Sequence, residues 1–308
     1  MTLAEQIELA CLMEATARKL GNVHPAARFD DLCYDDFARA AEASAPILAR
    51  AEQLGIGRTV LEAVRATRAV CATNVNLGIC LLIAPLAAVP QRLELHRHIR
   101  RILKATTVED AEQVYEAIRL MQPGGLGTAP EQDVAQAPTL TLQQVMSLAA
   151  QRDLVAREHA TEYRTLQRVA VPSLVKWWHE GIDGRPLPQA DRGPPMTVWE
   201  TAVVQTHLRL IAGLDTLIQR KCGTEVAQEA ARRAEQVMLA GNLYTDASVA
   251  AYRDFDAWLR ADGHRRNPGT TADLIAACLF WAIREGYIQP PTKADVLDHA
   301  GQIAAANA

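Results

Sequence analysis

The chain lacks the features that mark several protein classes. Its 308 residues carry 32 lysines and arginines against 36 aspartates and glutamates, a formal charge of −4. Nucleic-acid-binding proteins usually show a basic excess, so this balance argues against that class. The most apolar run, residues 75–90, is shorter than the roughly 20 residues that a membrane-spanning helix needs. Acidic residues at positions 5, 8 and 14 argue against a signal peptide. We therefore expect a cytoplasmic protein with no nucleic-acid or membrane partner.

No pair of cysteines in the chain has C-x-x-C spacing. Most of the six cysteines stand in apolar, helix-like sequence: Cys11, Cys33, Cys71, Cys80, Cys222 and Cys278. This distribution is typical of reduced core residues in a cytosolic protein and not of a disulfide framework or a zinc site.

Alternating runs of Val, Ile and Thr, which would indicate strands, are nearly absent. Apolar residues instead recur at helical spacing in segment after segment. Helices are predicted within 3–17 and 58–71, and at about 35–53, 76–88, 92–104, 107–121, 140–149, 151–180, 196–214, 224–240, 246–261, 269–286 and 292–306. The sequence thus predicts an all-α fold, a single multi-helix globular bundle of roughly a dozen helices.

Two long loops interrupt the helices, at residues 123–138 and 181–195. Loops of this length are often lids or crossovers, and they can also separate subdomains. Neither half of the chain has a self-sufficient pattern. We therefore predict one all-helical nucleotide-binding domain over residues 1–308, with 181–195 as the alternative subdomain boundary.

The sequence has no G-x-S-x-G, G-x-x-x-x-G-K-[ST] or H-E-x-x-H motif. Its most informative segment is residues 262–280, where His264, Arg265 and Arg266 precede a Pro-Gly turn and an apolar helix. A helix N-terminus beside cationic side chains is a ready site for phosphate. Thr270 or Thr271 can cap this helix, so a capped helix with surface arginines is the simpler alternative.

Carboxylates and a lysine gather early in the chain. Lys19-Leu-Gly-Asn-Val is followed by four aspartates, at positions 30, 31, 35 and 36. Carboxylates in a loop before a helix suit Mg²⁺, which prefers oxygen ligands. Acidic residues are equally typical of a helix N-terminus, so Asp35 and Asp36 have that alternative.

Two further breaks carry amides and glycines. Asn74 and Asn76 precede the most apolar helix, and an unpaired buried amide costs about 1–3 kcal/mol. They are therefore expected either to face a ligand or to cap that helix. The segment Pro-Gly-Gly-Leu-Gly at 123–127 allows the backbone to approach an anion closely, although a loop that ends a helix looks the same.

Two charged sites complete the set. Arg152, Asp153 and Arg157 form a cluster early in a predicted helix, which is usually a solvated face. Asp215 stands at the end of an apolar helix, where the helix dipole disfavours a negative charge. A metal ion or a nearby arginine would explain an aspartate at that position.

The order of these segments resembles the triphosphoribosyl-dephospho-coenzyme A synthase family, as a divergent branch of it. The resemblance rests on Lys-Leu-Gly-Asn-Val at 19–23, Asp-Asp-Phe at 35–37, Asn-Val-Asn-Leu-Gly at 74–78, Asp-Thr at 215–216 and Gly-Thr-Thr-Ala-Asp-Leu-Ile-Ala-Ala at 269–277. The family is all-α. Its best-known members transfer the triphosphoribosyl group of ATP to the 2′-hydroxyl of dephospho-coenzyme A and release adenine. The product is the precursor of a prosthetic group of citrate and malonate lyase-type enzymes.

The resemblance implies an ATP-dependent transferase that uses Mg²⁺ with ATP. Displacing adenine builds positive charge on the ribose, so a carboxylate near C1′ would stabilise the sugar or deprotonate the acceptor. Asp36, Asp153 and Asp215 are the candidates for this role. Asp30, Asp31, Asp35, Asp36 and Asp215 are the candidates for holding Mg²⁺. The candidates for binding nucleotide and phosphate are Lys19, Asn22, Asn74, Asn76, Gly78, His264, Arg265, Arg266, Asn267, Gly269, Thr270 and Thr271.

One motif departs from the family. The usual second motif reads roughly Gly-Val-Asn-Thr-His-Lys-Gly, whereas residues 73–78 read Thr-Asn-Val-Asn-Leu-Gly, with no His or Lys. Two other functions therefore stay open. One is another ATP-dependent transfer or ligation in cofactor biosynthesis, for example of a one-carbon carrier. The other is a helical nucleotide-binding or partner-binding module without catalysis. Helical enzymes of this size often dimerise, so a homodimer fits the chain.

Overall fold

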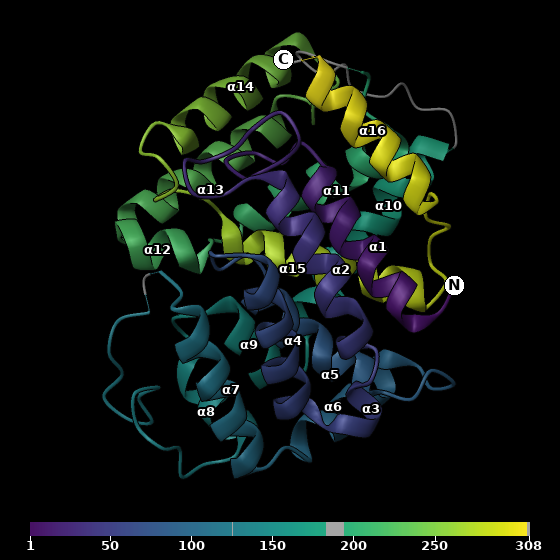
Figure 1. Ribbon diagram of the computed structural model, residues 1–308. Helices are drawn as coiled ribbons and strands as arrows, with labels where there is room; N and C mark the ends of the chain where they lie inside the picture. The colour runs from purple at the N-terminus through teal and green to yellow at the C-terminus, as the bar shows by residue number, and fades with distance from the viewer. Residues whose placement is uncertain (125, 183–193, 307–308) are drawn as a thin grey trace.

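The computed structural model describes residues 1–124, 126–182 and 194–306, and these residues are built from helices (Figure 1). The described residues form sixteen α-helices and one π-helical turn, with only two isolated β-bridges. The predicted all-α fold is therefore confirmed. Most of the predicted loop at 181–195, and with it the alternative subdomain boundary, lies outside the described residues, as does Gly125. The single-domain organisation stays a prediction.

The helices follow one another with short connections over most of the chain. Their bounds are α1 (Leu3–Thr16), α2 (Tyr34–Leu48), α3 (Ala51–Leu54), α4 (Ile56–Val70), α5 (Leu77–Ala88), α6 (Leu95–Lys104), α7 (Val108–Met121), α8 (Leu142–Ala149), α9 (Leu154–Ala160), the π-helical turn η1 (Leu166–Ala170), α10 (Val171–Ile182), α11 (Val198–Ile211), α12 (Thr216–Cys222), α13 (Thr224–Leu239), α14 (Asp246–Arg260), α15 (Gly269–Arg284) and α16 (Lys293–Ala305). No helix in the described part of the chain is both long enough and apolar enough to cross a membrane.

Local sequence explains where several helices begin. Thr2, Thr107 and Thr292 each accept a hydrogen bond from the backbone N–H three residues later, and an acidic side chain at that later position bonds back to the threonine N–H. This reciprocal capping box satisfies two backbone donors that a helix start leaves unpaired. These starts can be recognised from the sequence because every group involved lies within one turn.

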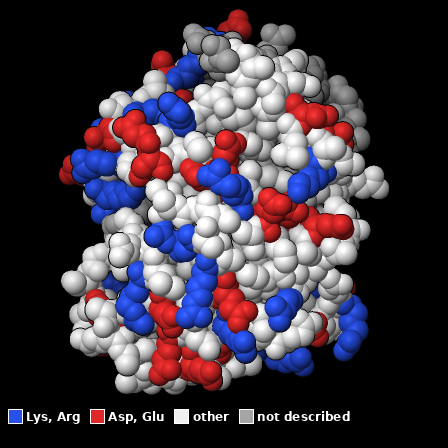
Figure 2. Space-filling view, in the orientation of Figure 1, with Lys and Arg blue, Asp and Glu red and all other residues white. Residues whose placement is uncertain are grey.

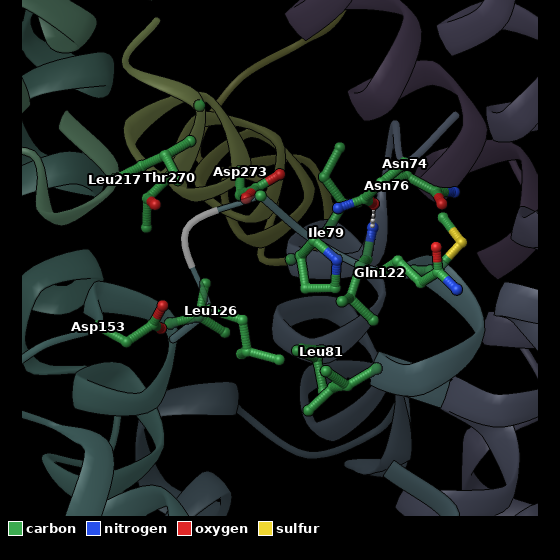
Figure 3. A pocket seen from close by; sticks show the side chains of 18 of the residues that line it. Asn74, Asn76, Ile79, Leu81, Gln122, Leu126, Asp153, Leu217, Thr270 and Asp273 are labelled. Atoms are coloured by element: carbon green, nitrogen blue, oxygen red, sulfur yellow. Dashed lines mark hydrogen bonds between the residues drawn. The ribbon is translucent and has the colours of Figure 1, made fainter. Parts of the chain in front are cut away.

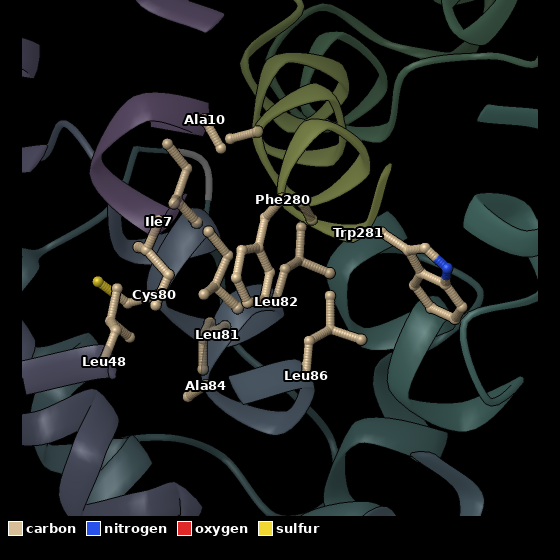
Figure 4. Close-up of a cluster of buried hydrophobic side chains, with 14 of the residues drawn as sticks. Ile7, Ala10, Leu48, Cys80, Leu81, Leu82, Ala84, Leu86, Phe280 and Trp281 are labelled. Carbon is tan, nitrogen blue, oxygen red and sulfur yellow. The ribbon is translucent and has the colours of Figure 1, made fainter. Parts of the chain in front are cut away.

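Two helices, α5 and α15, form the centre of the molecule. They are apolar on nearly every side, as expected for helices that other helices surround. Figure 4 shows Ile7 of α1, Leu82 of α5 and Phe280 of α15 packed together in the larger hydrophobic core. A smaller core joins α11–α14, with Phe255 and Leu259 among its buried residues. On the face shown in Figure 2, basic and acidic side chains are interspersed and form no single basic surface.

The predicted helix at 151–180 is wrong in one respect, because the chain breaks there into α9, η1 and α10. Glu162 and Tyr163 adopt positive φ values of 57° and 62° at the break. Such values are uncommon for residues other than glycine and need support from surrounding structure. The support comes from α5, since the hydroxyl of buried Tyr163 donates to the carbonyl of Leu82 at 2.7 Å.

A proline inside α5 explains a second contact between these segments. Pro85 has no N–H, so the carbonyl of Leu81, four residues earlier, lacks its helical partner. His159 replaces that partner, because its Nε2 lies 3.0 Å from the Leu81 oxygen. The ring is fully buried. The contact holds α9 against the middle of α5, where Leu81 also lines the cavity described below.

Stability is expected to decrease in mild acid because of His159. Burial lowers the pKa of His159 to about 4, whereas an unfolded histidine has a pKa of about 6.5. Between these values the unfolded state binds more protons than the folded state. The free energy of unfolding should therefore fall by on the order of 3 kcal/mol as pH drops from 6.5 to 4. Urea denaturation across this range would measure the slope.

A His159→Gln variant is the matched comparison for this effect. Glutamine keeps an amide donor for the Leu81 carbonyl but does not titrate. The variant should therefore show a shallower dependence of stability on pH than the wild type. Equal slopes for the two proteins would contradict the assignment of this pH dependence to His159.

Candidate active site

A cavity of about 540 Å³ lies among several helices. The start of α15 and α12 form one part of its wall, and α5, α7, α8 and α9 form another. Ten of the residues predicted for the site line it: Asn22, Asp31, Asn74, Asn76, Gly78, Asp153, His264, Asn267, Gly269 and Thr270. The other eight do not: Lys19, Asp30, Asp35, Asp36, Asp215, Arg265, Arg266 and Thr271. The fold thus brings together segments that lie more than 250 residues apart in sequence, such as those of Asn22 and Asp273.

Two buried amides of this cavity have an oxygen without a partner. Asn76 and Asn267 are 4% and 9% exposed, and the Oδ1 atom of each is buried with no hydrogen bond among the described residues. Leaving such an acceptor unpaired costs about 1–3 kcal/mol. A ligand with hydrogen-bond donors would remove that cost. These two amides are therefore the polar groups most in need of a bound molecule.

Gly78 allows α5 and α15 to approach closely at the cavity. A Cβ atom added at Gly78 would lie 2.1 Å from Oδ2 of Asp273 and 2.5 Å from its Cγ. Another residue type fits there only if the Asp273 side chain rotates away or one of the helices moves. Figure 3 shows Asp273 and Asn76 along the upper side of the cavity, with Leu81 below them and Asp153 to the left.

Cations line the edge of the cavity that α12 forms. Arg220 donates to Oδ2 of Asp153 and to the carbonyl of Arg152. Nζ of Lys221 would lie 3.7 Å from a Cβ added at Gly124, so this amine lies beside the glycine-rich loop after α7. The side chains of Arg152 and Lys221 form no hydrogen bond or ion pair with other residues in the described ranges. Both are free to bind an anion.

Other parts of the cavity wall are apolar. They are formed by Leu81, Val145, Met146 and Leu148, together with Leu126 of the glycine-rich segment. A mostly apolar wall with a few polar groups is the usual composition of a small-molecule site. The arrangement suits a ligand that carries negative charge at one end and a flat or apolar group at the other.

Asp215 is held in place by four hydrogen bonds. It is 1% exposed and caps α12, with Oδ1 accepting from the N–H groups of Leu217 at 2.8 Å and Ile218 at 3.0 Å. Its Oδ2 accepts from the N–H and hydroxyl of Thr271 at 2.8 and 2.7 Å. The prediction that Asp215 ends a helix is therefore wrong. Asp215 instead begins α12, a short helix that the sequence did not indicate. Both of its oxygens accept hydrogen bonds from the protein, and the N–H of Thr271 is one of the donors.

Three predicted phosphate-binding cations do not line the cavity and have partners within the protein. Lys19 is fully buried, and its Nζ lies 3.0 Å from Oε1 of Glu14. Arg266 lies over the Trp258 ring at 4.5 Å and donates to the Trp258 carbonyl at 2.9 Å. Arg265 donates to Asp262 and to the carbonyl of Lys221, both at 3.3 Å. Each cation serves packing between segments in this structure.

The five aspartates predicted to hold Mg²⁺ are not brought together. Asp36 accepts from the N–H of Cys33 at 3.0 Å and from Arg39 at 2.6 Å. Asp35 lines a second hollow, and Asp30 is exposed. Only Asp31 reaches the cavity, 3.9 Å from His264. In the described part of the chain no three His, Cys, Asp or Glu side chains are placed to hold a metal ion.

Sequence reasoning missed several residues of the cavity, above all Asp273. Its position in the sequence indicates only an acidic residue in the first turn of a helix, which is a common arrangement. Arg68, Arg220 and Lys221 also line the cavity without having been predicted. A signal existed for Asp273, because it lies within the Gly-Thr-Thr-Ala-Asp segment at 269–273 that carries the family resemblance.

Comparisons with known proteins identify the family and support the fold. The model of the CitG family, described as ATP:dephospho-CoA triphosphoribosyl transferase, matches residues 1–291. A solved structure from Archaeoglobus fulgidus, of a protein provisionally named triphosphoribosyl-dephospho-coA synthase, is similar with a TM-score of 0.58 and 24% sequence identity. The similarity covers 81% of this chain and 99% of that one, and it supports the fold. The comparison with curated proteins found no match.

The family match extends over nearly the whole chain, in line with the resemblance read from the sequence. ATP as a substrate fits that family, and so does the cavity with its cationic edge. The chain belongs to the ATP:dephospho-CoA triphosphoribosyl transferase family and is a transferase enzyme.

Proposed function

We propose that this transferase moves the triphosphoribosyl group of ATP to a hydroxyl of dephospho-coenzyme A in the cavity between α15 and α7–α9. The proposal rests on the observation that distant segments of the sequence meet at this cavity. The Asn-Val-Asn-Leu-Gly segment before and at the start of α5 and the Gly-Thr-Thr-Ala-Asp segment of α15 both line this cavity, opposite Asp153. These segments are far apart in the sequence, and two of them carry the family resemblance.

The triphosphate is proposed to lie along the cationic edge. Arg152 and Lys221 are unpaired among the described residues, and Arg220 is held beside them by Asp153. Cationic side chains bind phosphate oxygens through strong charge-assisted hydrogen bonds. Gly269 and Thr270 lie at the start of α15, where the positive end of the helix dipole adds to this field.

Mg²⁺ is proposed to enter with ATP. This ion usually keeps several waters and takes one or two carboxylates together with substrate phosphates, so a dedicated cluster of protein ligands is not required. Asp31 is the member of the predicted metal set that lines the cavity. Its carboxylate is exposed and could complete the coordination of a phosphate-bound ion at the cavity mouth.

Removing one cation from the edge should weaken ATP binding. Lys221→Met and Arg152→Met are each expected to raise the Kd for Mg-ATP about tenfold, since a hydrogen bond to a charged group contributes about 1.5–3 kcal/mol. Arg209→Met is the matched control, because Arg209 is exposed on α11 and does not line the cavity. Isothermal titration calorimetry would measure all three. Equal affinities for the edge variants and the control would place the phosphates elsewhere.

The reaction itself is tested by its products. Purified protein incubated with Mg-ATP and dephospho-coenzyme A should release free adenine and form the triphosphoribosyl adduct, both identified by mass spectrometry. Reactions with 3′-phosphorylated coenzyme A and with other hydroxyl acceptors serve as comparisons. Formation of ADP or AMP without adenine would show a different ATP-dependent reaction on this scaffold.

A further inference from the structure

Asp273 differs from the three nearby carboxylates Glu14, Asp153 and Asp215, because those three have partners. Glu14 pairs with Lys19, Asp153 with Arg220, and Asp215 with Thr271 and the start of α12. Asp273 makes no hydrogen bond or ion pair within the described part of the chain, although it lies in the first turn of α15 at the cavity wall. A carboxyl group that has no cationic partner and lies near other carboxylates favours its neutral form.

The carboxylates that surround Asp273 also favour its neutral form. Burial raises the pKa of Asp273 well above its usual value, and the negative charges of Glu14, Asp153 and Asp215 raise it further, against a smaller opposing effect of Arg220. The groups that face it are Cys11 and Glu14 of α1, Cys80 of α5, Asp153 before α9, and Asp215 and Arg220 at the two ends of α12. A protonated carboxyl group presents an O–H donor to the cavity.

Asn76 presents the complementary group. Its Nδ2 donates to Oγ of Ser44 at 3.2 Å, and that hydroxyl donates its own proton to the carbonyl of Ala40 at 2.6 Å. Because the Ser44 proton is donated to Ala40, the Ser44 oxygen can only accept from Asn76. Asn76 therefore bonds to it through Nδ2 and not through Oδ1. The orientation of the amide is thereby determined. The atom left over is the unpaired, buried acceptor Oδ1.

One donor and one acceptor on the same wall match one edge of a purine. Adenine carries an acceptor, N7, beside a donor, the 6-amino group. We infer that Asp273 and Asn76 together bind this edge of the ATP base, and that Asp273 is the acid that protonates adenine as it leaves. The inference rests on the proposed function, since it needs adenine as the leaving group.

The chemical step balances with the groups present. The bond between ribose C1′ and adenine N9 breaks, and its electron pair goes to the base. The proton of the Asp273 carboxyl passes to N7, so that neutral adenine leaves. The acceptor hydroxyl oxygen bonds to C1′, and its proton passes to the carboxylate of Asp153, which Arg220 holds in place. A return of this proton to Asp273 through water restores the enzyme.

Three proteins separate the roles of Asp273. Asp273→Asn keeps a donor toward N7 but cannot give up a proton, so Mg-ATP should bind within about threefold of the wild type while kcat falls at least about 100-fold. Asp273→Ala removes the donor as well as the proton, so it should bind Mg-ATP more weakly and also have a lower kcat. Thermal unfolding is the folding control, and the asparagine variant is expected to be as stable as the wild type because the carboxyl group has no partner. An Asp273→Asn enzyme that keeps kcat within about tenfold of the wild type would overturn the acid role.

A binding measurement tests the purine edge without requiring turnover. The probe is 7-deaza-ATP, which lacks the N7 acceptor. The wild type should bind ATP about fivefold or more tightly than 7-deaza-ATP, and Asp273→Ala should bind the two alike. Equal discrimination by both proteins would overturn the contact with N7. A wild type that discriminates in this way but releases no adenine with any acceptor would instead contradict the proposed function.

Discussion

Replacing Gly78 by alanine should lower kcat at least about 100-fold, because a displacement of about 1 Å at a reacting group can have an effect of this size. The added Cβ would lie 2.1 Å from Oδ2 of Asp273, far inside van der Waals contact. The aspartate side chain has only one carbon between its carboxyl group and the helix backbone. It can avoid the methyl group only by rotating away or by shifting α15 from α5.

Gly301→Ala is the matched control for this variant. Gly301 lies inside α16, and a Cβ added there meets nothing within 4 Å. The control should keep full activity and gain up to about 1 kcal/mol of stability, since alanine favours a helix over glycine. Steady-state kinetics and thermal unfolding of both variants would be compared. A Gly78→Ala enzyme with wild-type kcat would show that the close contact with Asp273 does not matter for the reaction.

Replacing Asp215 by alanine should destabilise the protein by roughly 3–5 kcal/mol, the range for breaking a buried polar network. The carboxylate accepts four hydrogen bonds from Leu217, Ile218 and Thr271. The variant would leave the first N–H groups of α12 and the N–H of Thr271 unpaired in a buried place. Because Asp215 joins the starts of α12 and α15, the cationic edge would lose its position against the cavity.

Asp36→Ala is the comparison that separates a structural role from a chemical one. Asp36 also bonds to a helix start, but it is only partly buried and its second partner is the exposed Arg39. Its loss should cost about 1 kcal/mol. Urea denaturation of both variants gives the free energies of unfolding. An Asp215→Ala protein as stable as the wild type but without turnover would return Asp215 to the catalytic role that the sequence suggested.

The positions of most helices could be predicted because their signals are local. The expected segments at 224–240 and 246–261 correspond to α13 and α14 almost residue for residue. Apolar spacing and capping side chains act within one or two turns, so they can be read from the sequence. The short helix α12 escaped notice because the residue that begins it, Asp215, had been interpreted as the end of the preceding helix.

The break between α9 and α10 could not be predicted for a different reason. Residues 151–180 carry a continuous helical pattern, and neither Glu162 nor Tyr163 is a residue that usually ends a helix. The positive φ values there are stabilised by contacts with α5, which is distant in the sequence. Tertiary structure thus decided against local preference at this position.

The same division applies to the site. The sequence by itself determined the all-α class, most helix positions and the segments that carry polar residues, because periodicity, caps and motif order are local properties. Only the tertiary structure decided which of those polar residues face the cavity. Lys19, Asp215 and Arg266 are held by partners from within the protein, whereas Asn76 and Asp273 keep unpaired groups at the cavity wall. Whether a polar side chain finds a partner depends on which helices pack together, and that packing is a property of the whole fold.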